Sequence, residues 1–246
     1  YRELDSTNRA AKEAAFSGEA GHGALILARR QKSGRGRRGR SFYSPENAGL
    51  YMSIVLRPDR TLKEGLLITT AAATAVYRAV KKICGIDLGI KWVNDLYLHN
   101  KKVCGILTEA VTDFESGNIE FAVVGIGLNL YVPEEGFPED IQETAGALFG
   151  SRKDAEHVNC SILVAEIANQ LLMEVETPGL SREYTENNII PGNMIVIADG
   201  ARTREAYAEA IASDGRLLVR EQDGSETLLS YGEVSVRRKP DKDQSK

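Results

Sequence analysis

The chain has 246 residues, of which 42% are hydrophobic, and a formal net charge of −4, so it can bury a sizeable core as one large domain with or without a small appendage. No apolar run approaches the ~20 residues that a membrane span needs, and no signal peptide opens the chain, so we expect a cytoplasmic protein without membrane contact. Three cysteines without CxxC spacing and three scattered histidines argue against a metal-ligand cluster and a histidine-based catalytic triad.

The first third of the chain predicts two helices and two strands. Asp5-Ser6-Thr7-Asn8 precedes alanines at helical spacing, and Gly18 follows them, which predicts a short capped helix. Apolar runs at Ala24–Ala28 and Leu50–Leu56 predict strands. Leu66–Ile83 is apolar with helical spacing and is long enough to be a buried helix.

A dense basic loop follows the first strand. Seven of the twelve residues from Arg29 to Arg40 are basic and none is acidic, and the rest of the chain has 24 basic against 35 acidic residues. Gly34, Gly36 and Gly39 match the GxGxxG pattern, but the loop sequence 41–45 follows where a dinucleotide-binding turn must open a helix. The loop therefore predicts a clamp for an anion, made of arginine forks and backbone N–H groups. On charge alone, a nucleic-acid patch or a solvated charge run is supported equally well.

The middle of the chain predicts three strands: Asp87–Lys91, Leu96–Leu98 and Val103–Ala110. Asn100-Lys101 supplies the turn between the last two. The cluster Lys91-Trp92-Val93-Asn94-Asp95 puts polar groups between the first two, and Lys102 enters a core strand, which is costly unless its ammonium meets an anion. A binding site and an ordinary hairpin explain this cluster equally well.

Glu120–Leu130 predicts a further strand, which is almost wholly apolar and hence central in a sheet. Its Gly125-Ile126-Gly127 indicates close approach by another backbone or a ligand, and Asn129 needs polar partners there. Taken alone, close packing is the simpler explanation. An acidic, proline-bearing loop at 131–143 and a helix at Cys160–Val175 follow.

The pattern changes to short strands from Pro191 onwards. Turn signals at Asp199-Gly200, Asp214-Gly215 and Asp223-Gly224 separate about five strands in roughly fifty residues, which predicts a small barrel. We expect an α+β fold, with a mixed sheet and flanking helices, followed by this barrel. The predicted divisions are a main domain, the barrel and a frayed polar tail: 1–187, 188–238 and 239–246.

Four of these segments together resemble the biotin–protein ligases, in particular the bacterial biotin–[acetyl-CoA-carboxylase] ligase type. Each motif alone is weak, whereas all four in the family's order and spacing are highly specific. The resemblance covers nearly the whole chain, and it implies a class II synthetase-like (biotin–lipoate ligase) catalytic domain with an SH3-like barrel at the C-terminus. The segments are Asp5-Ser6-Thr7-Asn8; Gln31 with 34–40; Lys91-Trp92-x-Asn94-Asp95 with Lys102 and Gly105-Ile106-Leu107; and Gly125-Ile126-Gly127-Leu128-Asn129.

The resemblance also implies roles for single residues. Lys102 and Arg37 would be catalytic, because they would neutralise two anions that must meet. Asp95 would face a Mg²⁺ ion carried by the nucleotide. Biotin would be bound by Ser6, Thr7, Asn8, Gln31, Arg35, Gly36, Arg37 and Lys102. The nucleotide would be bound by Arg37, Arg38, Lys91, Trp92, Asn94 and Asn129.

The implied reaction uses biotin and ATP as substrates and has two steps. Biotin's carboxylate attacks the α-phosphate of Mg·ATP, which gives biotinoyl-AMP and pyrophosphate. A lysine amine of the partner, the biotin carboxyl carrier domain of acetyl-CoA carboxylase or a related biotin-dependent enzyme, then attacks the mixed anhydride and releases AMP. A glycine-rich loop that orders over the anhydride would keep water away from it. The family also implies a homodimer.

The sequence departs from the family pattern in two ways. Val93 stands where the family usually has proline, which alters the rigidity of the turn but removes no functional group. The chain begins four residues before Asp5, too few for the helix-turn-helix domain of regulatory members, so we expect no DNA partner for this chain.

Two alternatives stay open. One is a lipoate or octanoyl ligase on a related fold, against which the arginine-dense loop and the Lys91-Trp92 pair favour biotin. The other is a nucleic-acid-binding module that uses residues 29–40, and the acidic charge of the remaining chain argues against it.

Overall fold

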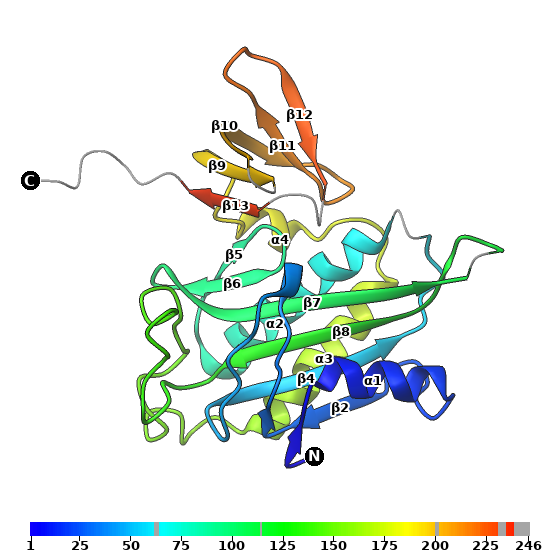
Figure 1. Cartoon of the computed structure of the whole chain (residues 1–246), viewed down its shortest axis with the longest axis vertical. Helices are drawn as coiled ribbons and strands as arrows, with labels where there is room; N and C mark the ends of the chain where they lie inside the picture. Colours follow the sequence, from blue (N-terminus) through cyan, green and yellow to red (C-terminus); the bar gives the residue numbers. More distant parts are fainter. Residues whose placement is uncertain (62–63, 114, 200–201, 231–234, 239–246) are drawn as a thin grey trace, which may run out of the picture.

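The structure, a computed structural model, describes residues 1–61, 64–113, 115–199, 202–230 and 235–238. Its centre is a six-stranded sheet in the order β2-β4-β8-β7-β6-β5 (Figure 1). Every pair in this sheet is antiparallel, so the expected mixed sheet is wrong. The physical reason is that β5 to β8 follow one another as hairpins, which reverse the chain at each turn. The strands are β2 (Leu25–Ala28), β4 (Gly49–Leu56), β5 (Gly89–Lys91), β6 (Asp95–Leu98), β7 (Lys101–Thr112) and β8 (Ile119–Asn129).

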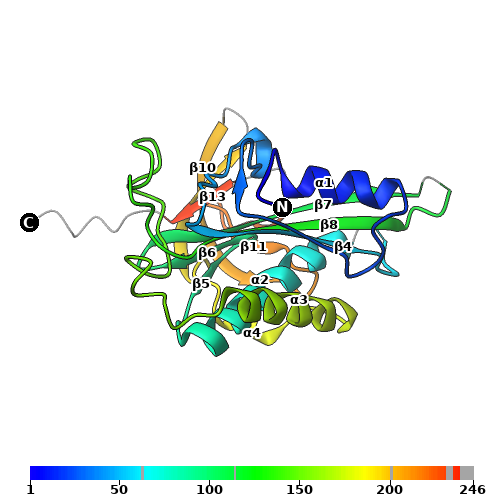
Figure 2. The ribbon, with the colours of Figure 1, turned by 90° about the horizontal axis from the view of Figure 1, so that it is seen from below.

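Helices cover both faces of this sheet (Figure 2). One face carries α1 (Thr7–Phe16), whose Ala11 and Ala15 pack against Phe121 and Val123 of β8. The other carries α2 (Gly65–Cys84), α3 (Cys160–Glu176) and α4 (Arg182–Glu186), which enclose the main core. Because both faces of β8 are buried and it lies between β4 and β7, its predicted central position is confirmed. Among the described residues, no helix is long and apolar enough to cross a membrane.

The predicted helices and strands up to residue 176 are confirmed, with small differences at their ends. The expected side-chain cap of α1 is wrong, because Ser6 at the N-cap position makes no capping hydrogen bond. The turn before β7 lies at His99-Asn100, where both residues have positive φ as a tight hairpin requires. Four short elements had no clear sequence signal and were not predicted. They are the parallel pair β1 (Glu3–Leu4) and β3 (Arg30–Gln31), the 3₁₀ turn η1 (Arg37–Gly39), and α4.

The C-terminal region forms a separate antiparallel sheet in the order β12-β11-β10-β9-β13, beside the β5–β6 end of the main sheet (Figure 1). Its strands are β9 (Asn193–Asp199), β10 (Arg202–Ile211), β11 (Leu217–Arg220), β12 (Glu226–Leu229) and β13 (Ser235–Arg238). The predicted turns at Asp214-Gly215 and Asp223-Gly224 lie between these strands.

Closure of the C-terminal sheet into the expected barrel is not seen, because no pair in the described part of the chain joins β12 to β13. Gly200 of the third predicted turn and the polar tail 239–246 lie outside the described residues.

Candidate active site

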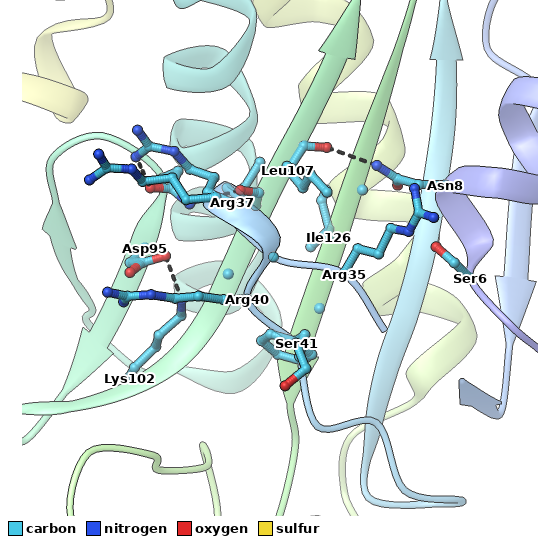
Figure 3. Close-up of a pocket in the computed structure, with 18 of the residues that line it drawn as sticks. Ser6, Asn8, Arg35, Arg37, Arg40, Ser41, Asp95, Lys102, Leu107 and Ile126 are labelled. Atoms are coloured by element: carbon cyan, nitrogen blue, oxygen red, sulfur yellow. Dashed lines mark hydrogen bonds and ion pairs between the residues drawn. The ribbon is translucent and has the colours of Figure 1, made fainter. Parts of the chain in front are cut away.

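A cavity of about 180 Å³ lies on the α1 face of the main sheet, where the basic loop passes over β7 and β8 (Figure 3). The structure brings nearly all predicted site residues together around it. Asn129 is the exception: its Nδ2 donates to the Gly146 carbonyl at 2.8 Å and so holds the loop that follows β8. The predicted residues that line the cavity are Ser6, Thr7, Asn8, Gln31, Arg35, Gly36, Arg37, Arg38, Lys91, Trp92, Asn94, Asp95 and Lys102.

The N-terminal end of α1 is fixed at the cavity by a hydrogen-bonded chain. Gln31 Oε1 accepts from the Thr7 backbone N–H at 2.8 Å and from the Thr7 hydroxyl at 3.1 Å. The Ser53 hydroxyl lies 2.8 Å from Thr7 Oγ1 and 2.7 Å from Asn8 Oδ1, and Gln31 Nε2 donates to Ser44 Oγ at 3.0 Å. Because these groups satisfy one another, α1 presents its first turn to the cavity in one orientation.

Asn8 is held on every side of its amide. Its Nδ2 donates to the Leu107 carbonyl at 3.2 Å and to Glu109 Oε2 at 2.9 Å, while Oδ1 faces Ser53. A Cβ added at Gly125 would stand 2.0 Å from Asn8 Oδ1. The glycine therefore allows the close approach that the sequence indicated, and the group that approaches is a side chain.

Gly127 makes room for an aromatic ring from the basic loop. A Cβ at Gly127 would lie 2.5 Å from Phe42 Cε1, and one at Gly105 would lie 3.2 Å from Phe42 Cε2. Gly105 and Gly127 are register partners on β7 and β8, so the two glycines form one flat floor on which Phe42 rests.

The basic loop is bent over the cavity by η1, within which Arg38 has a left-handed conformation with φ 56°. Arg37 Nη1 donates to Asn94 Oδ1 at 2.9 Å, and Asn94 Nδ2 donates to the Ile106 carbonyl at 2.8 Å. Arg35, Arg37 and Arg40 extend from the loop on the cavity side (Figure 3). The loop thus concentrates cationic donors over an otherwise small polar cavity, as an anion clamp requires.

Lys102 and Asp95 form an ion pair inside the cavity. Lys102 Nζ lies 2.7 Å from Asp95 Oδ1, and the two side chains are 32% and 23% exposed (Figure 3). The anion that the ammonium of this strand lysine meets is therefore the carboxylate of Asp95.

Two hydrogen bonds join the turn between β5 and β6 to other parts of the chain. Trp92 Nε1 donates to the Gly215 carbonyl of the C-terminal region at 2.9 Å, and the Tyr184 hydroxyl of α4 donates to the Val93 carbonyl at 3.0 Å. Lys91 Nζ lies 5.0 Å from the centre of the Tyr97 ring. Lys91 and Trp92 line the cavity, and the indole N–H of Trp92 is engaged with the C-terminal region.

The thiol of Cys104 and the phenol of Tyr184 are buried close to the site, which disfavours their ionised forms. Burial raises the pKa of the Cys104 thiol and of the Tyr184 phenol. Cys104 is completely buried in the main core, so it does not supply a thiolate nucleophile to the cavity.

Ser53, Phe42 and Glu109 were not singled out from the sequence. Ser53 did leave a signal, because a serine in the middle of the apolar run Gly49–Leu56 must find partners when it is fully buried. Phe42 and Glu109 left none, because an aromatic residue in a loop and a glutamate in a strand are common in surface positions.

The cavity does not fit a metal ion held by protein ligands. In the part of the chain that the structure describes, no three His, Cys, Asp or Glu side chains gather at one place, and Asp95 is the single carboxylate that lines the cavity. That carboxylate already contacts the Lys102 ammonium. A magnesium ion here would depend on ligands supplied by a substrate.

Comparison with known proteins gives consistent matches. Residues 1–129 match the biotin/lipoate A/B protein ligase family. The "Bifunctional ligase/repressor BirA" of Bacillus spizizenii is 30% identical, over 92% of this chain and 70% of that protein. The "Biotin--[acetyl-CoA-carboxylase] ligase" of Mycobacterium tuberculosis is 28% identical, over 95% of this chain and 89% of that protein.

A solved structure gives the same result. The biotin protein ligase from Aquifex aeolicus in complex with biotin and ATP superposes with a TM-score of 0.78 at 25% identity, and covers 97% of each chain. These matches confirm the resemblance inferred from the four motifs, and the superposition shows the same fold. The chain belongs to the biotin/lipoate A/B protein ligase family.

Proposed function

We propose that this chain is an ATP-dependent biotin–protein ligase. It activates biotin as biotinoyl-5'-AMP and transfers the biotinoyl group to a lysine of a biotin carboxyl carrier domain, of acetyl-CoA carboxylase or a related enzyme. The observation that carries this proposal is the meeting of Arg37 and Lys102, from segments far apart in the sequence, over one cavity beside the N-terminus of α1. Its relatives named as biotin ligases support the choice of substrates.

The first step joins two anions, so its main obstacle is their repulsion. We assign Lys102 and Arg37 to the junction of biotin's carboxylate with the α-phosphate, where they lower the charge that builds up as the carboxylate oxygen attacks. We assign Arg35 to the carboxylate end through its guanidinium, and Gly36, whose N–H donates to the Arg40 carbonyl, to the cavity wall beside it. Pyrophosphate leaves with the electron pair of the broken P–O bond.

The uncharged part of biotin is assigned to the polar groups around α1. Ser6, Thr7, Asn8 and Gln31 lie together at one end of the cavity. The fixed orientation of Thr7, Asn8 and Gln31 offers a preorganised surface for the ureido ring, which reduces the ordering cost of binding.

The nucleotide is assigned to the other end of the cavity. We assign Arg38, Lys91 and Asn94, which line the cavity, to its phosphates and sugar, and Trp92 to the turn that carries Asn94. Asn129 acts through the loop 130–146 that its amide holds, rather than from the cavity wall.

The second step needs the anhydride to persist until the acceptor arrives. The basic loop has glycines at 34, 36 and 39 and lies across the cavity mouth, so it can close over the adenylate and exclude water. The acceptor lysine amine then attacks the carbonyl carbon, the bond to the phosphate oxygen breaks, and AMP leaves.

The finer organisation of the molecule belongs to the same proposal. We assign residues 1–187 to the biotin and ATP domain and 188–238 to an SH3-like barrel, of which β9 to β13 are the described strands. We also retain the homodimer that the family implies and a cytoplasmic location.

The two alternatives receive less support. A lipoate or octanoyl ligase belongs to the same family, but the named relatives are biotin ligases. A nucleic-acid-binding module would use the basic loop as an open surface, whereas Arg37 turns inward to Asn94 and lines the cavity.

The test is direct. Incubation with biotin, Mg·ATP and a biotin-acceptor domain should give an acceptor heavier by one biotin, measured by mass spectrometry. Arg37→Ala should impair formation or retention of biotinoyl-AMP by about 100-fold while the fold stays intact. Arg29→Ala, an exposed arginine of the same basic run that does not line the cavity, is the matched control and should leave the rate unchanged. Absence of both the adenylate and the labelled acceptor would show that the proposal is wrong.

A further inference from the structure

Oδ1 of the Asp95 carboxylate contacts a lysine ammonium, so a cation bound at this oxygen would stand beside a positive charge. We propose that Asp95 is a positioning residue, which holds the Lys102 ammonium at the place where biotin's carboxylate binds, and that Mg²⁺ is held by the nucleotide phosphates without Asp95. This inference rests on the proposed function, because it takes Lys102 as the group that contacts biotin. It starts from the 2.7 Å ion pair between Lys102 Nζ and Asp95 Oδ1.

A β-bulge turns Lys102 toward the cavity. In a regular strand, residues three apart point to opposite faces, so Lys102 and Gly105 should lie on opposite sides of β7. The register shifts here, because Leu96 pairs with Cys104 and Tyr97 with Lys102, which leaves Val103 as an extra residue. Val103 and Cys104 are both completely buried in the main core, and Lys102 is redirected to the face of Gly105.

The missing side chain of Gly105 gives the ammonium its place. A Cβ at Gly105 would lie 3.1 Å from both Cε and Nζ of Lys102, so the lysine stem lies directly over this glycine. Gly105 is the register partner of Asp95, which puts the carboxylate on the neighbouring strand at the same level. The bulge, the glycine and the carboxylate together determine where the charge of Lys102 stands.

The other charges in the cavity explain why the Lys102 ammonium needs a carboxylate to position it. The lining contains Arg35, Arg37, Arg38, Arg40, Lys91 and Lys102, and these cations repel one another before the anionic substrates arrive. Asp95 offsets this repulsion at Lys102, and the neighbouring Asn94 orients Arg37 in the same way through its Oδ1. A carboxylate oxygen that contacts an ammonium is also a poor ligand for a second cation, because the two positive charges would stand side by side.

The decisive measurement is biotin binding by calorimetry, without ATP or Mg²⁺. If Asp95 acted only through its charge, removing that negative charge from a site that binds an anion should tighten biotin binding. If Asp95 were only a metal ligand, its loss should leave biotin binding without Mg²⁺ unchanged. If Asp95 positions Lys102, Asp95→Asn should instead weaken biotin binding by about tenfold. In a Lys102→Met background the same change should cause no further weakening, because the positioned group is already gone.

The matched control is Asp87→Asn, which breaks the exposed Lys81–Asp87 ion pair of the same 2.7 Å length and should leave biotin affinity unchanged. In a separate titration, the Mg²⁺ concentration for half-maximal biotinoyl-AMP formation should be the same in Asp95→Asn as in the unaltered protein. Equal or tighter biotin binding by Asp95→Asn, or a tenfold rise in its Mg²⁺ requirement, would overturn the inference. An unaltered protein that does not bind biotin at all would instead overturn the proposed function.

Discussion

At the scale of single residues, the site depends on small groups that bond to one another more than on its charged side chains. Ser53 is fully buried, and its hydroxyl faces both Thr7 Oγ1 and Asn8 Oδ1. Gly125 and Gly127 contribute by having no side chain, because Asn8 and Phe42 occupy the space above them. The charged residues can select an anion only after these groups have fixed the cavity wall.

Ser53→Ala tests this view. The substitution removes a hydroxyl whose single proton reaches either Thr7 Oγ1 or Asn8 Oδ1, so a buried oxygen loses its donor. We therefore expect the free energy of unfolding to fall by about 1–3 kcal/mol. Biotin affinity should fall as well, because Asn8 and Thr7 lose their common anchor. Urea unfolding and calorimetry measure the two effects. Ser17→Ala removes an exposed serine hydroxyl that bonds only to the Ala14 carbonyl, and should change neither quantity. A stable Ser53→Ala protein with unaltered biotin affinity would contradict the anchoring role.

At the scale of elements, Arg78 of α2 links the helices that cover the sheet face opposite the cavity. Its guanidinium contacts Glu174 of α3 at 2.6 Å and Glu183 of α4 at 2.9 Å, so three helices share one ion-pair network. The hydrogen bond from Arg78 lowers the pKa of Glu183 from its ordinary value of 4.5 to about 2. Tyr184 follows directly and bonds to the Val93 carbonyl, so this network also supports the turn at the cavity.

The lowered pKa of Glu183 predicts a loss of stability in acid. A carboxylate whose pKa is lower in the folded state stabilises the fold fully above the unfolded value of 4.5, and this contribution disappears as the pH falls toward 2. Because Glu183 is 43% exposed, solvent screens the pair, and we expect about 1 kcal/mol or less. The unaltered protein should therefore have a higher free energy of unfolding than Glu183→Gln at neutral pH. This difference between the two proteins should shrink by about pH 3. A constant difference at every pH would rule out the ionised pair as its source.

The elements also show how far the sequence alone reaches. Strand β8 and helix α2 were predicted because burial on both sides makes long apolar runs, and the pattern is local. The parallel pair β1–β3 and the bulge at Val103 were not, because both depend on which strand lies next to which. Likewise, the motifs predicted that Asp95 and Lys102 belong to the site, but their contact with each other is seen only in the side-chain positions of the structure.

At the scale of the whole molecule, the C-terminal sheet touches the site through the indole of Trp92. The hydrogen bond from Trp92 Nε1 to the Gly215 carbonyl joins the turn before Asn94 to the β10–β11 turn, and Gly215 also packs on Leu66 of α2. The C-terminal sheet is therefore one of two supports of this turn, and Tyr184 of α4 is the other. Because Asn94 orients Arg37, a change in either support should reach the basic loop.

Trp92→Phe separates these two supports, because it keeps an aromatic ring and removes only the N–H donor to Gly215. If the C-terminal sheet positions the nucleotide end of the cavity, the KM for ATP should rise several-fold. Biotin binding without ATP should change less, because among the groups assigned to biotin only Arg37 is linked to this turn, through Asn94. Tyr184→Phe removes the support from α4 and leaves Gly215 in place, so it serves as the comparison. Each variant leaves a buried carbonyl without its donor and should lose about 1–3 kcal/mol of stability. A KM for ATP that changes in Tyr184→Phe but not in Trp92→Phe would assign the turn to the main domain alone, with the C-terminal sheet contributing stability but not nucleotide binding.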